Sequence, residues 1–492
     1  TKRKQYQDNK QTAILKQKRN MLKTKIDDGE ANAAEASEYI RLGPEIASKI
    51  KDERALITTL EDTAYNMGKR HDIGSAAMYR PYKPKGGSHW VQETFEADWT
   101  DTSNPIRTGN MCTDTAKQAH AATPYWKQLF KARPQVPHQV TKCLNVLKNG
   151  NRVHAPAASM CGENITTKEI AEICKRLPTG KSPGPDRIPN KFYKHLSKVI
   201  APIIAAVANE SRTNKKYPPN FADGLISTIY KKGERDDPRN YRPITLLNGD
   251  YKIIMRTLTK RMNTTVTQFT SKFQTGFVPG AFLPENIMLL KLAQAYAENE
   301  NENAYFLFLD MEKAFDRCSW DFLLQALKKV GFDDDFISYI KLAYSQDNAP
   351  ERQLYTNGYL GPKFNIRSGV AQGCPLSPLL FLLITEPLTR LIMQSPENEI
   401  KGIKINAIRY IISQYADDTT LLLSPGDQPA VNRILKLWEL ATGMKENIDK
   451  REGQLLAKLN RERNRAPTDV VREWLADGKT IRALGAPMGN SF

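Results

Sequence analysis

Three aspartates stand at the ends of strongly apolar segments, where a carboxylate costs free energy unless it is paired or bound to a cation. Asp310 ends the run AYFLFLD, and Asp417-Asp418 lies in YADD between the runs RYIISQ and TTLLL. Taken singly, these residues have ordinary explanations: a surface or helix-capping aspartate, and a solvated turn. Together, carboxylates on neighbouring strand ends can hold two magnesium ions about 3.5–4 Å apart, with manganese as an alternative. Such a pair would activate a 3′-hydroxyl and stabilise a leaving pyrophosphate.

The hydrophobic pattern predicts the elements that would position these carboxylates. Strands are predicted at 224–230, 304–310, 408–414 and 419–423, the last two forming a hairpin around Asp417. A helix capped by Thr166 or Thr167 is predicted, and further helices at 190–209, 250–262, 320–330, 377–391 and 429–442. Residues 113–130 are expected to be helical, and the proline-containing stretch 134–156 to be a linker.

Length and charge narrow the class of protein. With 492 residues the chain exceeds one hydrophobic core, so we expect two to four subdomains. Its 72 Lys and Arg against 54 Asp and Glu give a net charge of +18, which suits a polyanionic partner. No apolar run reaches the roughly 18–20 residues of a membrane span, which favours nucleic acid over a membrane. The six cysteines form no CxxC pair, which disfavours zinc and a disulfide scaffold.

Eight blocks in residues 177–489 resemble, in order, the reverse transcriptase domain of LINE-class (non-LTR) retrotransposons. They are LPTGKSPGPDRIPNKFYK, LISTIYKKGERDDPRNYRPITLL, QTGFVPG, FLDMEKAFD, GVAQGCPLSPLLF, YADD, TGMKENIDK and LGAPMG. The resemblance implies an α+β right-hand polymerase fold with a mostly helical N-terminal extension. The implied organisation is a basic helical linker (1–60), an N-terminal extension (61–165) and the reverse transcriptase (166–492). Within the last, fingers would span about 175–300 and palm 301–492. The sequence stops before a thumb, and it starts without Met, so we expect a fragment.

The resemblance also implies a role for individual residues. Asp310 and Asp417 would bind both metal ions and Asp418 would complete the acidic tip. The implied nucleotide-binding residues are Lys231 or Lys232 with Arg242 at the triphosphate, Phe315 beneath the sugar, Gln372 at nucleotide and template, and Tyr415. Lys450 would donate a proton to pyrophosphate, and Leu484–Gly489 would grip the primer. The ordinary alternatives are a solvated turn for Lys231, a core aromatic for Phe315 and a helix-entry amide for Gln372.

The implied activity is RNA-directed DNA synthesis from a 3′-hydroxyl primer. Its partners would be an RNA template, a DNA primer and deoxynucleoside triphosphates, with no membrane, in an intracellular setting that is nuclear or ribonucleoprotein-associated. Two alternatives stay open. A group II intron-like maturase usually reads QGGPLSP, where this chain has Cys374 after Gly373. A decayed, non-catalytic remnant is suggested by Ala281 and Ala371, where the family commonly carries arginine.

Overall fold

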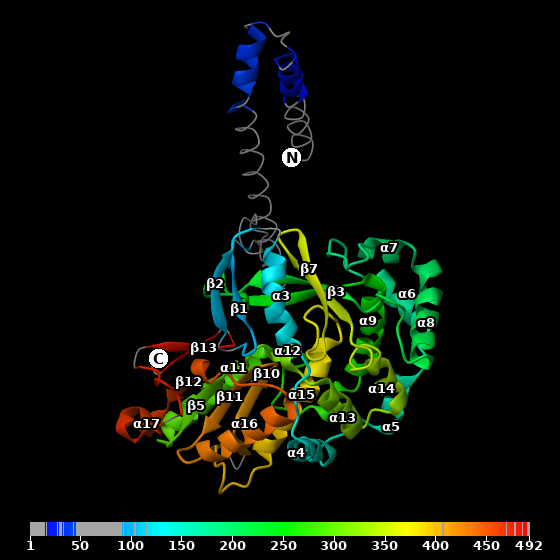
Figure 1. Cartoon of the computed structure of the whole chain (residues 1–492). Helices are drawn as coiled ribbons and strands as arrows, with labels where there is room; N and C mark the ends of the chain where they lie inside the picture. The colour runs from blue at the N-terminus through cyan, green and yellow to red at the C-terminus, as the bar shows by residue number, and fades with distance from the viewer. Residues whose placement is uncertain are drawn as a thin grey trace, which may run out of the picture. The chain divides into compact units, whose positions relative to one another are not determined.

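The computed structural model describes parts of residues 15–45 and most of residues 91–489 (Figure 1). Short gaps in the second range fall at 92, 103–104, 115–116, 406–407, 469, 477–478 and 485. The chain forms two compact units, Thr1–Gly86 and Gly87–Phe492. Much of the predicted basic helical linker (1–60), and the start of the predicted N-terminal extension (61–165), lie outside the described residues.

In the first unit, residues 17–26 and 34–42 are helical. Leu22 and Leu42 are buried in a small apolar cluster. Two ion pairs add to it, Lys18 with Glu38 at 2.6 Å and Lys25 with Glu35 at 2.7 Å. Because these ion pairs are largely exposed, the apolar contact provides most of the attraction within the described part of this unit.

The second unit contains an antiparallel four-stranded sheet in the order β10-β11-β5-β12. Its strands are β5 (Tyr305–Leu309), β10 (Ile412–Tyr415), β11 (Asp418–Leu423) and β12 (Glu452–Leu455). The centre of this sheet is buried on both faces, which explains the continuous apolar runs YFLFL and TTLLL. The predicted hairpin around Asp417 is confirmed, with Tyr415 opposite Asp418.

A second four-stranded sheet has the order β4-β3-β6-β7 and is mixed, since β3 runs parallel to β6. Its strands are β3 (Gly224–Tyr230), β4 (Tyr241–Leu247), β6 (Glu351–Thr356) and β7 (Tyr359–Asn365). Three two-stranded sheets complete the strands of the described ranges: β1 (Thr94–Asp98) with β2 (Ile106–Cys112), β8 (Ile403–Ile405) with β9 (Ile408–Tyr410), and β13 (Thr480–Ala483) with β14 (Ala486–Gly489).

Helices pack around both larger sheets in the second unit, as Figure 1 shows. They are α3 (Gln118–Leu129), α4 (Pro137–Lys148), α5 (Ala155–Gly162), α6 (Thr167–Lys175), α7 (Asn190–His195), α8 (Ser197–Thr213), α9 (Gly249–Asn263), α10 (Val266–Phe269), α11 (Leu283–Asn299), α12 (Ala314–Arg317), α13 (Trp320–Val330), α14 (Asp334–Lys341), α15 (Ser377–Met393), α16 (Gln428–Thr442) and α17 (Ala457–Arg461). The mixed α and β composition agrees with the expected class. None of these helices combines the length and hydropathy that a bilayer crossing requires.

The structure confirms several helix ends that the local sequence predicted. Thr166 caps α6 in a capping box with Glu169, each side chain bonding the other residue's main-chain N–H. Ser319 caps α13, and Gly331 ends that helix with a φ of 106°, a conformation that glycine adopts without strain. Helix α15 is buried along nearly its whole length, and the Trp438 indole of α16 donates to its Ile384 carbonyl at 2.7 Å.

Four expectations about elements are wrong. The predicted linker 134–156 contains α4, which begins at Pro137 and buries Val140, Leu144 and Leu147. Residues 94–112 form the β1–β2 hairpin, where no strand was expected. The predicted strand 408–414 is two strands, because residues 408–410 pair with β8 and residues 412–415 pair with β11. The predicted helix 190–209 is interrupted at Leu196, which separates α7 from α8.

Candidate active site

Strand register brings the predicted carboxylates together. Leu309 of β5 lies opposite Thr419 of β11, so the next residues outward, Asp310 and Asp418, end neighbouring strands. Asp417 occupies the two-residue turn between β10 and β11, after Ala416, whose φ is +58°. Positive φ at a turn matches the right-handed twist of the flanking strands. The three aspartates therefore lie at one end of the antiparallel sheet, at neighbouring strand ends, as the sequence predicted.

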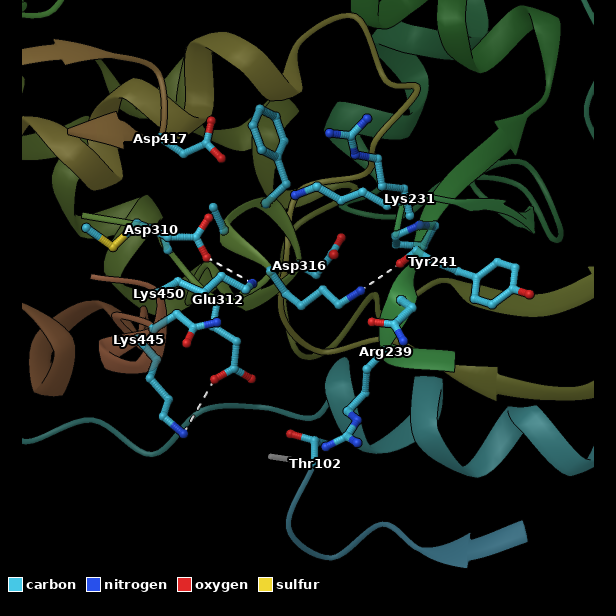
Figure 2. Close-up of a pocket in the computed structure, with 18 of the residues that line it drawn as sticks. Thr102, Lys231, Arg239, Tyr241, Asp310, Glu312, Asp316, Asp417, Lys445 and Lys450 are labelled. Carbon is cyan, nitrogen blue, oxygen red and sulfur yellow. Dashed lines mark hydrogen bonds and ion pairs between the residues drawn. The ribbon is translucent and has the colours of Figure 1, made fainter. Parts of the chain in front are cut away.

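A cavity of about 890 Å³ opens beside Asp310 and Asp417 at this end of the sheet (Figure 2). Most of the predicted site residues line it: Lys231, Lys232, Arg242, Asp310, Phe315, Gln372, Asp417 and Lys450. Tyr415 and Asp418 are not among its lining residues. Figure 2 shows the Lys231 side chain extending from the second sheet toward Asp310 and Asp417. The cavity thus joins carboxylates from one sheet to cations from the other.

The ionised forms of Asp417 and Asp418 are disfavoured at this end of the sheet. Burial raises the pKa of Asp417, and Asp310 adds a smaller repulsion. Desolvation raises the pKa of Asp418 to about 6, with further contributions from Asp417 and Asp310. Desolvation and neighbouring negative charge, which raise the pKa of Asp417 and Asp418, favour a bound cation. A donor set made only of carboxylate oxygens fits Mg²⁺ or Mn²⁺. Within the described ranges, no three acidic, histidine or cysteine side chains already converge at metal-binding distances.

Because the ionised form of Asp418 is disfavoured in the folded protein, we expect Asp418→Asn to raise the melting temperature of the metal-free protein at about pH 8. At that pH the Asp418 carboxylate is ionised although it is desolvated and repelled by Asp417 and Asp310, and the amide removes this unfavourable charge. The difference should shrink as the pH falls below about 6 and vanish only below about pH 3, where wild-type Asp418 is neutral in both folded and unfolded protein. Thermal melts in EDTA measure this. Added Mg²⁺ should stabilise the wild type more than the variant, and an Asn variant that melts lower at pH 8 would contradict the assignment.

Two lysines that line the cavity, Lys231 and Lys450, interact with Asp310. The pKa of Lys231 is lowered by burial and by Arg242, while Asp310 opposes that effect. Lys450 Nζ lies 3.1 Å from Asp310 Oδ2. The loop that carries Lys450 is fixed to β5, because the Asn447 N–H donates to the Asp310 carbonyl at 2.8 Å. A buried ion pair of Glu446 with Arg451, two contacts of 2.7 Å, holds the same loop.

Phe315 and Gln372 are held by different partners. The Phe315 ring stacks on Phe381, with centroids 4.6 Å apart and planes at 10°, and meets the edge of Phe277 at 6.2 Å. The Gln372 amide donates to both oxygens of buried Asp316 at 3.1 and 3.2 Å. Its main-chain carbonyl accepts from Thr245 of β4 at 2.7 Å, which ties the second sheet to the cavity. Both side chains are therefore preorganised on the cavity wall.

Sequence reasoning assigned no role to two polar residues in FLDMEKAFD. Lys313 has a φ of +48°, and its ammonium donates to the Tyr241 carbonyl at 2.6 Å. Burial lowers the pKa of Lys313 and raises that of Asp316. Both line the cavity, as do Arg239, Glu312 and Lys445. The available signal was local: Lys313 and Asp316 lie within six residues of the strand-end carboxylate Asp310.

Comparison with known proteins gives a family match to the part of the chain that contributes most of the cavity-lining residues. Residues 229–452 match the family model "Reverse transcriptase (RNA-dependent DNA polymerase)". The chain is similar to the "Transposon TX1 uncharacterized 149 kDa protein" of Xenopus laevis, with 26% identity over 402 residues, 79% of this chain and 28% of that protein.

Two proteins of Drosophila melanogaster are also similar. The "Probable RNA-directed DNA polymerase from transposon BS" is 31% identical over 53% of this chain, and the "RNA-directed DNA polymerase from mobile element jockey" is 27% identical over 52%. These matches cover 28% and 27% of the two proteins. The matched part of the chain therefore spans just over a quarter of the length of each of these three proteins.

Proposed function

We propose that this chain, which carries a reverse transcriptase domain of the kind found in non-LTR retrotransposon proteins, extends a primer 3′-hydroxyl on an RNA template with deoxynucleotides. The domain's RNA-directed DNA polymerase family supplies the reaction class. The observation that carries the proposal is the cavity itself, where strand-end carboxylates face lysines and an arginine from a second sheet. Opposed acids and cations of this kind suit a metal-bound triphosphate.

Asp310 and Asp417 would hold two divalent cations, magnesium or manganese, with Asp418 contributing to the acidic tip. Bound there, the cations would activate the hydroxyl and stabilise the leaving group. Lys231, Lys232 and Arg242 would bind the triphosphate, Arg242 as a planar fork on phosphate oxygens. Lys450 would release Asp310 when the cations bind and then protonate pyrophosphate.

The two larger sheets would be the palm and the fingers. We assign the palm to the antiparallel sheet with Asp310 and Asp417, and the fingers to the region around β3 and β4. The cavity opens between these sheets, which is where template, primer end and nucleotide would meet. The β13–β14 hairpin, containing Leu484–Gly489, would contact the primer. Tyr415, outside the cavity lining, would support the adjacent turn.

The net charge of +18 predicts that RNA binding weakens steeply with salt. Each phosphate neutralised on a single strand should contribute about −0.7 to the slope of log K against log salt concentration. Fluorescence anisotropy with one labelled RNA across a KCl series measures the slope. A neutral-backbone analogue of that RNA should show little salt dependence and is the matched control. A flat titration with the natural RNA would remove nucleic acid as the partner.

Primer extension tests the activity. Poly(rA) annealed to oligo(dT), with dTTP and Mg²⁺, should give extended DNA, and EDTA should stop it. A non-catalytic remnant would bind the duplex without extending it. A maturase-like enzyme would extend it equally, so the assay tests the chemistry rather than the biological system.

A further inference from the structure

The turn that carries Asp417 is held by a side chain far away in the sequence. Gln274 is 2% exposed and belongs to the segment QTGF, 142 residues before Ala416. Its Oε1 accepts the N–H groups of Ala416 at 2.8 Å and Gly276 at 2.9 Å. Its Nε2 donates to the Ala416 carbonyl at 3.2 Å. One amide therefore satisfies both main-chain polar groups of the residue that precedes Asp417.

The main chain around Gln274 runs beside β10 as a short parallel bridge, Gln274 with Gln414. The Gln414 N–H donates to the Phe273 carbonyl at 2.8 Å, and the Thr275 N–H donates to the Gln414 carbonyl at 3.0 Å. Since β10 is an edge strand of its sheet, this segment covers the edge next to the turn. The Gln274 side chain that holds Ala416 therefore extends from backbone that is itself hydrogen-bonded to β10.

The segment is anchored to the core on its other side. The Ser271 N–H donates to Glu386 at 3.0 Å, and Glu386 is 1% exposed and paired with Arg390 at 2.7 Å. Asn286 of α11 donates to the Ser413 hydroxyl and the Gln414 carbonyl at 2.9 and 3.0 Å. Movement of the turn would therefore break buried hydrogen bonds that have no replacement.

Space as well as hydrogen bonding fixes the turn. A Cβ added to Gly276 would lie 2.1 Å from the Ala416 nitrogen, so only glycine permits this approach. Ala416 itself has a φ of +58°, which L-residues other than Asn and Asp adopt rarely. An uncommon backbone conformation persists when its surroundings over-determine it, and such positions cluster at functional sites. Phe277, the next residue of the segment, also contacts Phe315.

We propose that Gln274 is a positioning residue that holds the Ala416–Asp417 turn, and through it the Asp417 carboxylate, in the geometry that divalent cations require. Gln274 touches none of the reacting groups. Its clamp sets the direction of the Asp417 main chain, and magnesium tolerates little departure from octahedral geometry. This inference rests on the proposed polymerase function.

The test is Gln274→Met, which keeps the side-chain length and removes the amide. At saturating primer–template, kcat should fall about ten- to a hundredfold, since small misplacements of a catalytic group have effects of this size. KM for the deoxynucleotide should stay within about threefold, and the half-saturating Mg²⁺ concentration should rise. Gly276→Ala, which displaces the turn sterically without removing a hydrogen-bonding group, should give the same pattern.

Asn209→Leu is the matched control. Its amide also clamps both main-chain groups of one residue, bonding the Ile165 N–H and carbonyl at 2.9 Å each, away from the cavity. It should lower stability and leave kcat and the Mg²⁺ titration of the folded enzyme unchanged.

If folded Gln274→Met and Gly276→Ala kept wild-type kcat and Mg²⁺ dependence, the positioning role would be overturned. Losses that only followed the folded fraction, as in Asn209→Leu, would overturn it too. A wild-type protein without extension activity would instead reject the proposed function.

Discussion

Asp417→Asn should reduce primer extension by at least about a thousandfold while RNA binding stays within about threefold of wild type. The carboxylate lies at the cavity edge with Asp310, and losing a cation ligand removes several kcal/mol of transition-state stabilisation. About 4 kcal/mol corresponds to a factor of about a thousand in rate. Single-turnover extension and anisotropy on the same preparations measure the two effects. Asp310→Asn should behave alike, with the added loss of the Lys450 contact.

Asp449→Asn is the control for this prediction. Asp449 also lines the cavity, but its side chain is 75% exposed and pairs with Arg472 at 2.9 Å. An exposed pair contributes little, so its extension rate should remain within about threefold of wild type. Substantial extension by Asp417→Asn, or an equal loss in Asp449→Asn, would contradict the metal assignment.

Phe315→Val should relax the discrimination between deoxyribonucleotides and ribonucleotides by about 10- to 200-fold. The ring lines the cavity five residues after Asp310, and its stacking on Phe381 prevents it from moving aside. A 2′-hydroxyl placed against it would meet a clash and an unpaired, desolvated polar group, for which about 1–3 kcal/mol is a reasonable cost. The measurement is the ratio of kcat/KM for dGTP over GTP on one RNA template.

This ratio separates a sugar-contacting role from a packing role. Loss of the ring will also reduce stability, but both substrates are measured on the same folded fraction, so the ratio is unaffected by unfolding. Phe336→Val, at a fully buried position on α14, should lower the melting temperature and leave the ratio unchanged. An unchanged ratio in folded Phe315→Val would remove Phe315 from the site and leave it a core aromatic.

Elements with a strong local pattern were predictable from the sequence. The apolar runs around Asp310 and Asp417 predicted β5, β11 and the β10–β11 hairpin, because short apolar runs bounded by turn residues are typical of buried strands. Capping residues predicted the starts of α6 and α13, because a side-chain oxygen that accepts a main-chain N–H bond favours a helix start. The ordered motifs also predicted eight of the ten candidate site residues that the structure could bring together, since all but Tyr415 and Asp418 line the cavity.

The failures have physical causes. Pro137 was taken as a linker signal, yet proline is favoured in the first turn of a helix, and the buried spacing of Val140, Leu144 and Leu147 was present. The β1–β2 hairpin lacks a clean alternation and contains a register shift, so its strands carried no clear periodic signal. The contact of Gln274 with Ala416 could not be predicted from local sequence, because it links segments that lie 142 residues apart.

We propose that this cavity supports RNA-templated DNA synthesis by carboxylate-bound cations. The most direct test compares wild type with Asp417→Asn and Asp449→Asn on poly(rA)/oligo(dT), with dTTP, across a Mg²⁺ titration. We expect Mg²⁺-dependent extension by the wild type and Asp449→Asn, and binding without extension by Asp417→Asn. Extension that persists in Asp417→Asn, or a folded wild type that binds the duplex and never extends it, would contradict it.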